Sequence, residues 1–261
     1  MDMISEAELI NKAGELGFKE IFLEKDYYLT VLLFLIKDIK GLYFKGGTAI
    51  NKILLDHPRL SEDIDFTCIR DVKELGKEII EAISKEKMFK KIEKGKDVQG
   101  FVRYLIYYNG FFEKESFIYI DLNQRGKILL EPEKKKFIHF YKEIIPEFQI
   151  SILNEKELIA EKICAAITRN APRDYYDLYN LIKSKHDIDL KVVRQKFKID
   201  KKEFKTEMIF KAATKIYNKW ETDLWPLTKT KPSYKEVINV LAKYFKYNQI
   251  KNSKKNSEQD K

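Results

Sequence analysis

The chain has 261 residues, of which 44% are hydrophobic and 13% aromatic, so it suits one large globular domain or two small ones and is not disordered overall. Its 50 basic and 41 acidic side chains give a net charge of +9, which favours a polyanionic partner such as nucleic acid. The two cysteines form no CxxC spacing and the apolar runs are too short to span a bilayer, which argues against a disulfide framework or a membrane role and indicates a cytoplasmic protein.

The N-terminal part of the sequence predicts two helices and a short strand. Ser5 and Glu8 have the spacing of a capping box at the start of the first helix. A more apolar helix is expected from about Glu24 to Asp38, followed by a strand at 42–44. The next helix is expected over 48–55, directly after a pair of glycines.

The glycine pair and two nearby carboxylates carry the clearest chemical signal. Gly46 and Gly47 let a backbone approach phosphate oxygens, and amides at the start of the following helix favour anions. Asp63 and Asp65 fall on one face of a β-rich run, because positions i and i+2 of a strand point the same way. Two close like charges usually persist because a divalent cation neutralises them. The stretch therefore predicts phosphate and Mg²⁺ chemistry.

The next elements predict more of the sheet. Asp71 can cap a helix over 72–84, and 98–108 with 116–122 predict an antiparallel pair joined around Asn109-Gly110. A polar loop is expected over 131–136 and a last strand over 148–152.

Asp121 near the end of the 116–122 strand is a candidate third carboxylate. Three acids on neighbouring strands can hold two Mg²⁺ ions, which activate a hydroxyl and stabilise leaving pyrophosphate. A plain acid on an edge strand explains Asp121 equally simply, and this alternative stays open.

After residue 152 the pattern becomes helical. Asn154 caps a helix to about Arg169, a second follows Pro172, and further helical segments are expected near 190–197, 201–219 and 233–247. The sequence thus predicts an α+β protein in which a mixed β-sheet with flanking helices precedes a mostly α-helical domain. The expected boundaries are 1–152 for the first domain, 153–250 for the helical domain and 251–261 for a disordered tail.

The helical half offers three candidate site residues. Lys162 lies beside the polar face of its helix and could meet a phosphate, although a solvated helix with Glu/Lys pairs is the simpler interpretation. Asp174 and Asp177 are one turn apart and could equally form a salt-bridge network between two helices.

Other chemistries find little support. The three histidines have no metal-ligand spacing, and Lys45-Gly-Gly-Thr is not a Walker A sequence. Tyr- and Lys-rich stretches such as 215–220 and 243–247 could offer stacking and charge to nucleic acid, but amphipathic helices with core aromatics explain them more simply.

Taken together, these motifs resemble a known family. Phe44-Lys-Gly-Gly-Thr-Ala, followed by Arg59-x-Ser61-x-Asp63-Ile64-Asp65-Phe66, is similar to the nucleotidyltransferase superfamily related to DNA polymerase β. Within it, the sequence resembles the AbiEii/AbiGii toxin family, the MenT-like nucleotidyltransferases of bacterial toxin–antitoxin systems. Further matches extend over roughly residues 24–182; they are Glu24-Lys25-Asp26-Tyr-Tyr, Glu157-Leu-Ile-Ala-Glu161-Lys162, and Arg169 with Arg173-Asp174-Tyr-Tyr-Asp177.

The resemblance implies both a reaction and a site. The reaction would be transfer of a nucleoside monophosphate from an NTP, with Mg²⁺ or Mn²⁺, to an acceptor hydroxyl at the 3′ end of tRNA. The protein would be the toxin of an abortive-infection, phage-defence system controlled by an antitoxin. Asp63 and Asp65 would hold the metal with Asp121, and Asp174 and Asp177 would complete the site. The expected nucleotide-binding residues are Lys45, Gly46, Gly47, Thr48, Ser61 and Lys162.

Two alternatives remain at this point. A protein-AMPylating enzyme would use the same site with a protein hydroxyl as acceptor. A catalytically inactive module would keep the fold and bind only RNA or a partner.

Overall fold

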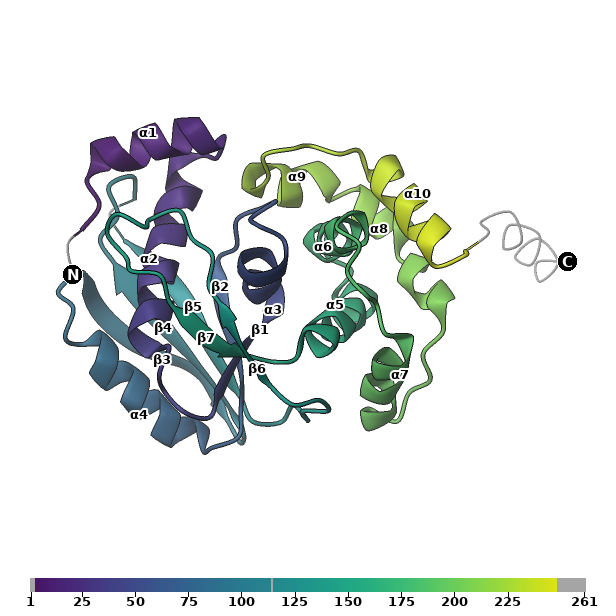
Figure 1. The fold of residues 1–261 in the computed structure, drawn as a ribbon, viewed down its shortest axis with the longest axis horizontal. Helices are drawn as coiled ribbons and strands as arrows, with labels where there is room; N and C mark the ends of the chain where they lie inside the picture. The colour runs from purple at the N-terminus through teal and green to yellow at the C-terminus, as the bar shows by residue number, and fades with distance from the viewer. Residues whose placement is uncertain (1–2, 114, 248–261) are drawn as a thin grey trace, which may run out of the picture.

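The computed structural model describes residues 3–113 and 115–247, so the predicted tail at 251–261 lies outside the described residues. Within them, a mixed seven-stranded sheet with flanking helices forms the N-terminal part, and helices alone form the C-terminal part (Figure 1). The predicted α+β class is confirmed. No helix in the described part of the chain has the length and apolar character needed to cross a bilayer.

Three longer helices belong to the N-terminal part; they are α1 (Glu6–Leu16), α2 (Glu20–Ile36) and α4 (Val72–Ile83). The predicted capping box is present, with the Glu8 amide donating to the Ser5 hydroxyl and the Ser5 amide donating to the Glu8 carboxylate at 2.8 Å. Asp71 caps α4 by accepting from two amides of its first turn. These polar side chains satisfy backbone groups that a helix leaves unpaired at its start.

The sheet has the strand order β3-β4-β5-β2-β1-β7-β6. The pairs β1–β7 and β2–β5 are parallel and the other four pairs are antiparallel. The strands are β1 (Leu42–Lys45), β2 (Asp63–Cys68), β3 (Phe89–Val98), β4 (Phe101–Tyr108), β5 (Ser116–Asn123), β6 (Glu133–Lys136) and β7 (Gln149–Ile152).

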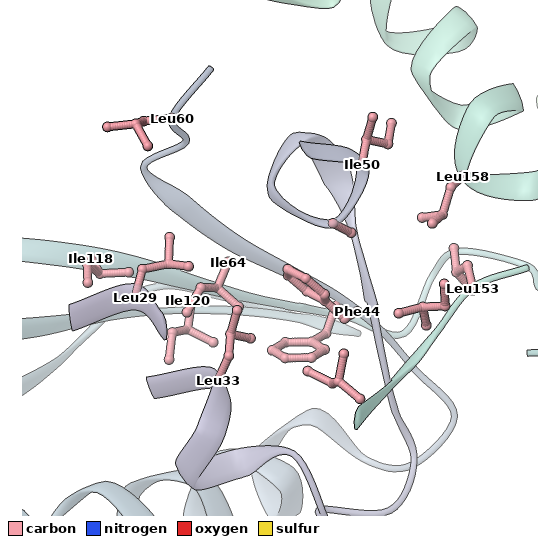
Figure 2. Packing of buried hydrophobic residues seen from close by; sticks show 14 of the residues in the cluster. Leu29, Leu33, Phe44, Ile50, Leu60, Ile64, Ile118, Ile120, Leu153 and Leu158 are labelled. Carbon is pink, nitrogen blue, oxygen red and sulfur yellow. The ribbon is translucent and has the colours of Figure 1, made fainter. Parts of the chain in front are cut away.

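One face of the sheet packs against α2. Leu29 and Leu33 of this helix lie beside Ile64 of β2 and Ile120 of β5, and all four are fully buried (Figure 2). Side chains alternate between the faces of a strand, so burying Ile64 turns Asp63 and Asp65 to the opposite face. That opposite face is the one on which Ile50 and Leu158 lie, and Leu158 belongs to helix α5 (Glu155–Arg169) (Figure 2).

The two edge strands were not predicted from the sequence. β6 occupies the expected polar loop at 131–136, so that prediction is wrong, and β3 ends at Val98, where the expected strand began. β3 and β6 lie at the two ends of the strand order and are rich in lysine. Edge strands pair on one side only and often carry lysines, which prevent further pairing, so they need no apolar alternation.

The chain between β1 and β2 is also helical. It forms a short helix, α3 (Gly46–Ala49), continued by a π-helical turn, η1 (Ile50–Leu54). The helix was expected from Thr48 and begins two residues earlier, so both glycines lie in its first turn.

The C-terminal part packs its helices around α5 and α6. The α-helices are α5 (Glu155–Arg169), α6 (Pro172–Lys183), α7 (Leu190–Ile199), α8 (Ala213–Tyr217), α9 (Trp220–Leu224) and α10 (Tyr234–Tyr244), with 3-10 turns η2 (Thr206–Phe210) and η3 (Trp225–Leu227). The segment near 201–219, expected to be helical, is helical only in part. Lys201 has a φ of 55°, a left-handed conformation that a continuing helix does not allow, and the segment divides into η2 and α8.

The segment ahead of β2 contacts the C-terminal part. The Leu60 amide donates to the Leu227 carbonyl at 2.9 Å, and Arg59 forms an isolated bridge with Thr228. Tyr176 of α6 donates to the Pro58 carbonyl at 3.2 Å. The two parts therefore share backbone contacts, and the division into domains at residue 152 stays a prediction.

Candidate active site

Four charged side chains form one row across the central strands. The register pairs Lys45 of β1 with Asp65 of β2, Asp65 with Asp121 of β5, and Asp121 with Arg103 of β4. Residues that lie opposite each other on neighbouring strands share a face of the sheet. The row therefore reads cation, carboxylate, carboxylate, cation, on the face opposite to the α2 packing.

Asp63 and Asp65 lie on this face without a partner of their own. In the described part of the chain, neither side-chain carboxylate has a hydrogen bond or ion pair within bonding distance. Burial raises the pKa of both, although Lys45 opposes this for Asp65 and Arg173 opposes it for Asp63. The protein thus holds two desolvated carboxylates side by side, an arrangement that favours a neutralising cation.

These two carboxylates fit a hard divalent cation. Mg²⁺ prefers oxygen ligands and is usually bound by one or two carboxylates together with substrate phosphates. No three Asp, Glu, His or Cys side chains among the described residues form a ready-made metal cluster. The available donor set is therefore the Asp63–Asp65 pair.

Asp121 is held by Arg103. The Nε and Nη2 atoms of Arg103 each donate to the Asp121 carboxylate at 2.7 Å, and the guanidinium lies 4.4 Å from the Tyr119 ring centroid. This pairing raises the pKa of the Arg103 guanidinium, chiefly through its hydrogen bond to Asp121. Arg103 was not predicted as a site residue. The feature that could have identified it is that it is the one charged residue in the Phe101–Tyr108 strand.

The two glycines are required by close contacts on both sides. Gly46 has a φ of 82°, and a Cβ there would lie 2.3 Å from Oδ2 of Asp65. A Cβ on Gly47 would lie 2.6 Å from Nη2 of Arg59 and 3.6 Å from Nζ of Lys162. The turn therefore passes between a carboxylate and two cations, at a separation that only glycine permits.

Thr48 and Ser61 bind each other. Their hydroxyl oxygens are 2.7 Å apart, Thr48 also contacts the Asp63 carbonyl, and both side chains are buried. They link the start of α3 to the start of β2, and neither lines the cavity described below. Their placement fixes the glycine turn relative to the carboxylates.

Asp177 is the centre of a buried charge network. Arg59 donates to both of its oxygens at 2.7 Å, Lys162 Nζ lies 2.9 Å from Oδ2, and Asn51 donates to Oδ1 at 3.1 Å. Burial alone would raise the pKa of Asp177, but Arg59 and Lys162 outweigh it and lower the pKa to about 2. Asp177 is fully buried and stays ionised between its partners.

Lys162 is shared by both acids of α6. Its Nζ lies 2.9 Å from Oδ1 of Asp174, as well as 2.9 Å from Asp177. Lys162 lines the cavity, whereas Asp174 and Asp177 do not. The predicted salt-bridge network and the predicted cation at the site are thus one arrangement, in which two acids position one lysine.

A cavity of about 160 Å³ lies between the sheet and α5. Its charged lining residues are Lys45, Asp65, Asp121, Glu161, Lys162 and Arg169. Ligand pockets usually measure roughly 300–1,000 Å³, so this volume suits a phosphate group better than a whole nucleotide. Three cations and three carboxylates line this cavity, and they are the kinds of group that phosphates and a metal ion require; Asp63 is not among the lining residues.

Glu161 was not among the predicted site residues. It accepts from Lys45 at 3.1 Å and from Lys196 at 2.9 Å. Burial would raise the pKa of Glu161, but Lys45 and Lys196 lower it. Its contact with Lys45 spans 116 positions of sequence and is therefore invisible to local pattern.

A protein-family model places the chain among known sequences. The model for the nucleotidyl transferase AbiEii toxin, type IV TA system, matches residues 33–240. No curated protein matches the chain.

Solved structures share the fold. MenT4, a nucleotidyltransferase toxin from Mycobacterium tuberculosis, is 19% identical with a TM-score of 0.70, over 97% of this chain and 93% of that one. JHP933 from Helicobacter pylori is 18% identical with a TM-score of 0.61, over 93% and 98%. A putative nucleotidyltransferase from H. pylori is 19% identical with a TM-score of 0.62, over 88% and 95%.

Proposed function

The chain belongs to the AbiEii family of nucleotidyltransferase toxins from type IV toxin–antitoxin systems, and from this we propose that it transfers a nucleoside monophosphate from an NTP to a hydroxyl of RNA. The acceptor we propose is the 3′ end of tRNA, and modifying it would stop translation. The family implies an antitoxin partner, and the cytoplasm and phage defence are the proposed setting.

One observation carries this proposal. The row Lys45–Asp65–Asp121–Arg103 holds two carboxylates between two cations, and its first three members line the cavity that Gly46 borders. Phosphoryl-type transfer depends mainly on positioning and on electrostatic stabilisation of phosphate charge. The row supplies both signs of charge on one rigid sheet face, where strand pairing fixes their spacing.

Asp63 and Asp65 would hold the metal ion. Mg²⁺ or Mn²⁺ bound there would neutralise phosphate charge and favour loss of the acceptor proton. Asp121 lies next to Asp65 in the row and adds negative charge, while Arg103 fixes its orientation.

Lys45, Lys162 and Arg169 would bind the phosphates. All three line the cavity, and the glycine turn leaves room for phosphate oxygens beside them. Asp174 and Asp177 act through Lys162, which they hold in place, and so they are positioning residues.

The reaction balances as a simple displacement. The acceptor oxygen forms a bond to the α-phosphorus, the bond from that phosphorus to the β-phosphate bridging oxygen breaks, and pyrophosphate leaves. The proton of the acceptor hydroxyl passes to water. The net charge of +9 suits an RNA acceptor, because a basic surface attracts a polyanion.

The test is label transfer. Purified protein is incubated with each α-labelled NTP in turn, Mg²⁺, and either total RNA or total protein. We expect label in a discrete tRNA band with one or a few NTPs, and at least a 100-fold lower rate for Asp65→Asn. Asp38→Asn is the matched control, because the Asp38 side chain is 73% exposed and lies in the turn after α2.

The outcomes separate the alternatives. Label in protein instead of RNA identifies the AMPylating enzyme and contradicts the proposed acceptor. Absence of label with every NTP and both acceptor pools contradicts the transferase activity. The remaining alternative is then the catalytically inactive module that binds only RNA or a partner.

A further inference from the structure

A second cavity, of about 790 Å³, lies in the C-terminal part around α9 and the start of α10. Its aromatic lining residues are Tyr217, Trp220, Trp225 and Tyr234, and its lysines are Lys231 and Lys235. Its volume is within the range of ligand pockets, whereas that of the cavity at the carboxylates is below it. The nucleotidyltransferase site does not use these residues.

The aromatic rings form a connected wall. Tyr234 meets Tyr217 edge-on at 5.5 Å between ring centroids and meets Trp220 edge-on at 5.6 Å. Lys231 lies 5.6 Å from the Trp225 ring centroid. Tyr217 is 63% exposed, so its ring is open to solvent and can accept a stacking partner. The wall combines π faces with cations, as sites for single-stranded nucleic acid do.

Two polar atoms of this lining have no partner. Nε1 of Trp225 and the hydroxyl of Tyr234 are both buried and make no hydrogen bond within the described part of the chain. Buried donors are almost always satisfied in folded proteins, so an unsatisfied pair calls for an explanation. Trp220, by contrast, donates from its Nε1 to the Pro232 carbonyl at 2.9 Å. Because both atoms are closed off from solvent, a ligand satisfies them only if its binding turns the two side chains toward the cavity.

The cavity is joined to the active site by backbone contacts. Trp225 begins η3, and Leu227 at its end accepts a hydrogen bond from Leu60. The adjacent residue, Arg59, binds Asp177 and lies against Gly47. In Figure 1, α9 accordingly lies beside the segment that leads into β2. A ligand in the cavity would therefore contact helices that are linked, through Leu60, Arg59 and Asp177, to Lys162.

We infer that this cavity binds an unpaired base of the acceptor RNA by stacking on its aromatic wall, away from the reacting end. This rests on the proposed function, because RNA is the acceptor proposed there. Lys231 and Lys235 carry the positive charge that the flanking phosphates need, and the exposed ring of Tyr217 offers a face on which a base can stack. A base held here fixes the register of the RNA and selects acceptors with a single-stranded segment at that spacing.

The chain contains its own probe for this site. Its only two tryptophans, Trp220 and Trp225, both line the cavity, so tryptophan fluorescence reports on its occupancy. The full chain is titrated, without NTP or Mg²⁺, with a short single-stranded oligoribonucleotide and with an abasic oligomer of the same length. We expect the oligoribonucleotide to quench fluorescence and the abasic oligomer, which has the same phosphates, to leave it unchanged.

Two variants sharpen the test. Tyr217→Ala should raise the Kd of the oligoribonucleotide roughly 5- to 100-fold, the range of one lost stacking contact. Tyr244→Ala is the control, since Tyr244 is 42% exposed on α10 and does not line the cavity. In label transfer, Tyr217→Ala should raise KM for RNA and leave kcat and KM for the NTP unchanged.

Equal quenching by the abasic oligomer, or equal Kd for Tyr217→Ala and Tyr244→Ala, overturns the inference. A protein occupant of the cavity would give the same negative result. The binding test is independent of catalysis, so base-dependent quenching without any label transfer would contradict the proposed function and leave this site standing. Label transfer to RNA in which Tyr217→Ala leaves KM for RNA unchanged would support the proposed function and overturn the inference about this cavity.

Discussion

Arg59 and Asp177 are 118 positions apart in the sequence, yet two nitrogens of the arginine each donate a 2.7 Å hydrogen bond to the aspartate. Both side chains are almost completely buried. The pair joins the segment ahead of β2 to α6 and so connects the two parts of the molecule. Because Asp177 also holds Lys162, the same contact positions a cation at the candidate active site.

Asp177→Asn should destabilise the protein strongly. The substitution keeps the size of the side chain but leaves the Arg59 cation buried without its hydrogen-bonded countercharge and leaves Lys162 paired with Asp174 alone. Breaking a buried pair in this way costs about 3–5 kcal/mol. Urea unfolding followed by circular dichroism measures the loss. Asp187→Asn, at a 73% exposed acid, is the control and should change the free energy of unfolding little.

Acid should remove the contribution of Asp177. Its pKa in the folded state is about 2, below the ordinary value of 3.8, so its ionised form stabilises the fold. That contribution is complete above about pH 4 and is lost as the pH falls through about 2. Unfolding free energies measured between pH 2 and 5 should therefore fall less steeply in Asp177→Asn than in the wild type. Parallel curves would contradict this assignment.

Asp65→Asn should raise stability while abolishing transfer. Burial raises the pKa of Asp65, so stability is lost as the pH rises and the carboxylate ionises inside the fold. The neutral amide avoids that cost at pH 7, and the variant should melt at a higher temperature than the wild type without metal. Functional sites commonly trade stability for activity in this way.

Mg²⁺ should raise the melting temperature of the wild type above that of Asp65→Asn. Mg²⁺ bound by Asp63 and Asp65 stabilises the wild type by mass action, and the variant lacks one of these ligands. Thermal unfolding with and without millimolar Mg²⁺ should show a rise in Tm for the wild type and for Asp38→Asn only. An equal rise in Asp65→Asn would place the metal elsewhere.

Arg103→Met should tighten divalent-cation binding. The substitution removes a positive charge that lies two strands beyond Asp65 in the row and leaves the Asp121 carboxylate unneutralised. Coulomb attraction to a divalent cation then increases, and we expect the apparent Kd for Mg²⁺ to fall roughly three- to tenfold.

Arg103→Lys keeps the charge and serves as the control, with an expected Kd close to that of the wild type. Both variants are compared by Mg²⁺ titration of Tm at low ionic strength, where charge effects are least screened. A weaker affinity in Arg103→Met would mean that Arg103 acts by orienting Asp121 as a ligand.

Glu161→Gln should improve nucleotide binding. Lys45 must leave Glu161, which it contacts at 3.1 Å, before it can bind a phosphate. Without the negative charge, Glu161 no longer competes with the phosphate for Lys45, and KM for the NTP should fall roughly three- to tenfold. Initial rates against NTP concentration measure the change. Glu78→Gln, which breaks the exposed Arg70–Glu78 pair, should leave KM unchanged, and a higher KM in Glu161→Gln would reject competition.

Local sequence determined the inner strands and the chemistry they carry. Apolar residues alternate with Asp63 and Asp65 in β2, and this alternation alone places the two carboxylates on one face. The glycine pair, the capping residues Ser5 and Asp71, and the helix that carries Lys162 are equally local features. Each depends on residues a few positions apart, so the sequence alone was enough to predict it.

Tertiary structure alone decided the edges of the sheet and the partners of the charges. β3 and β6 pair on one side only, so their lysine-rich sequences showed no apolar pattern to detect. The pairs Arg59–Asp177 and Lys45–Glu161 span more than a hundred positions, and no local spacing encodes such contacts. Whether a carboxylate faces a metal site or a buried guanidinium depends on burial and on which strand lies next to it, and only the folded chain fixes both.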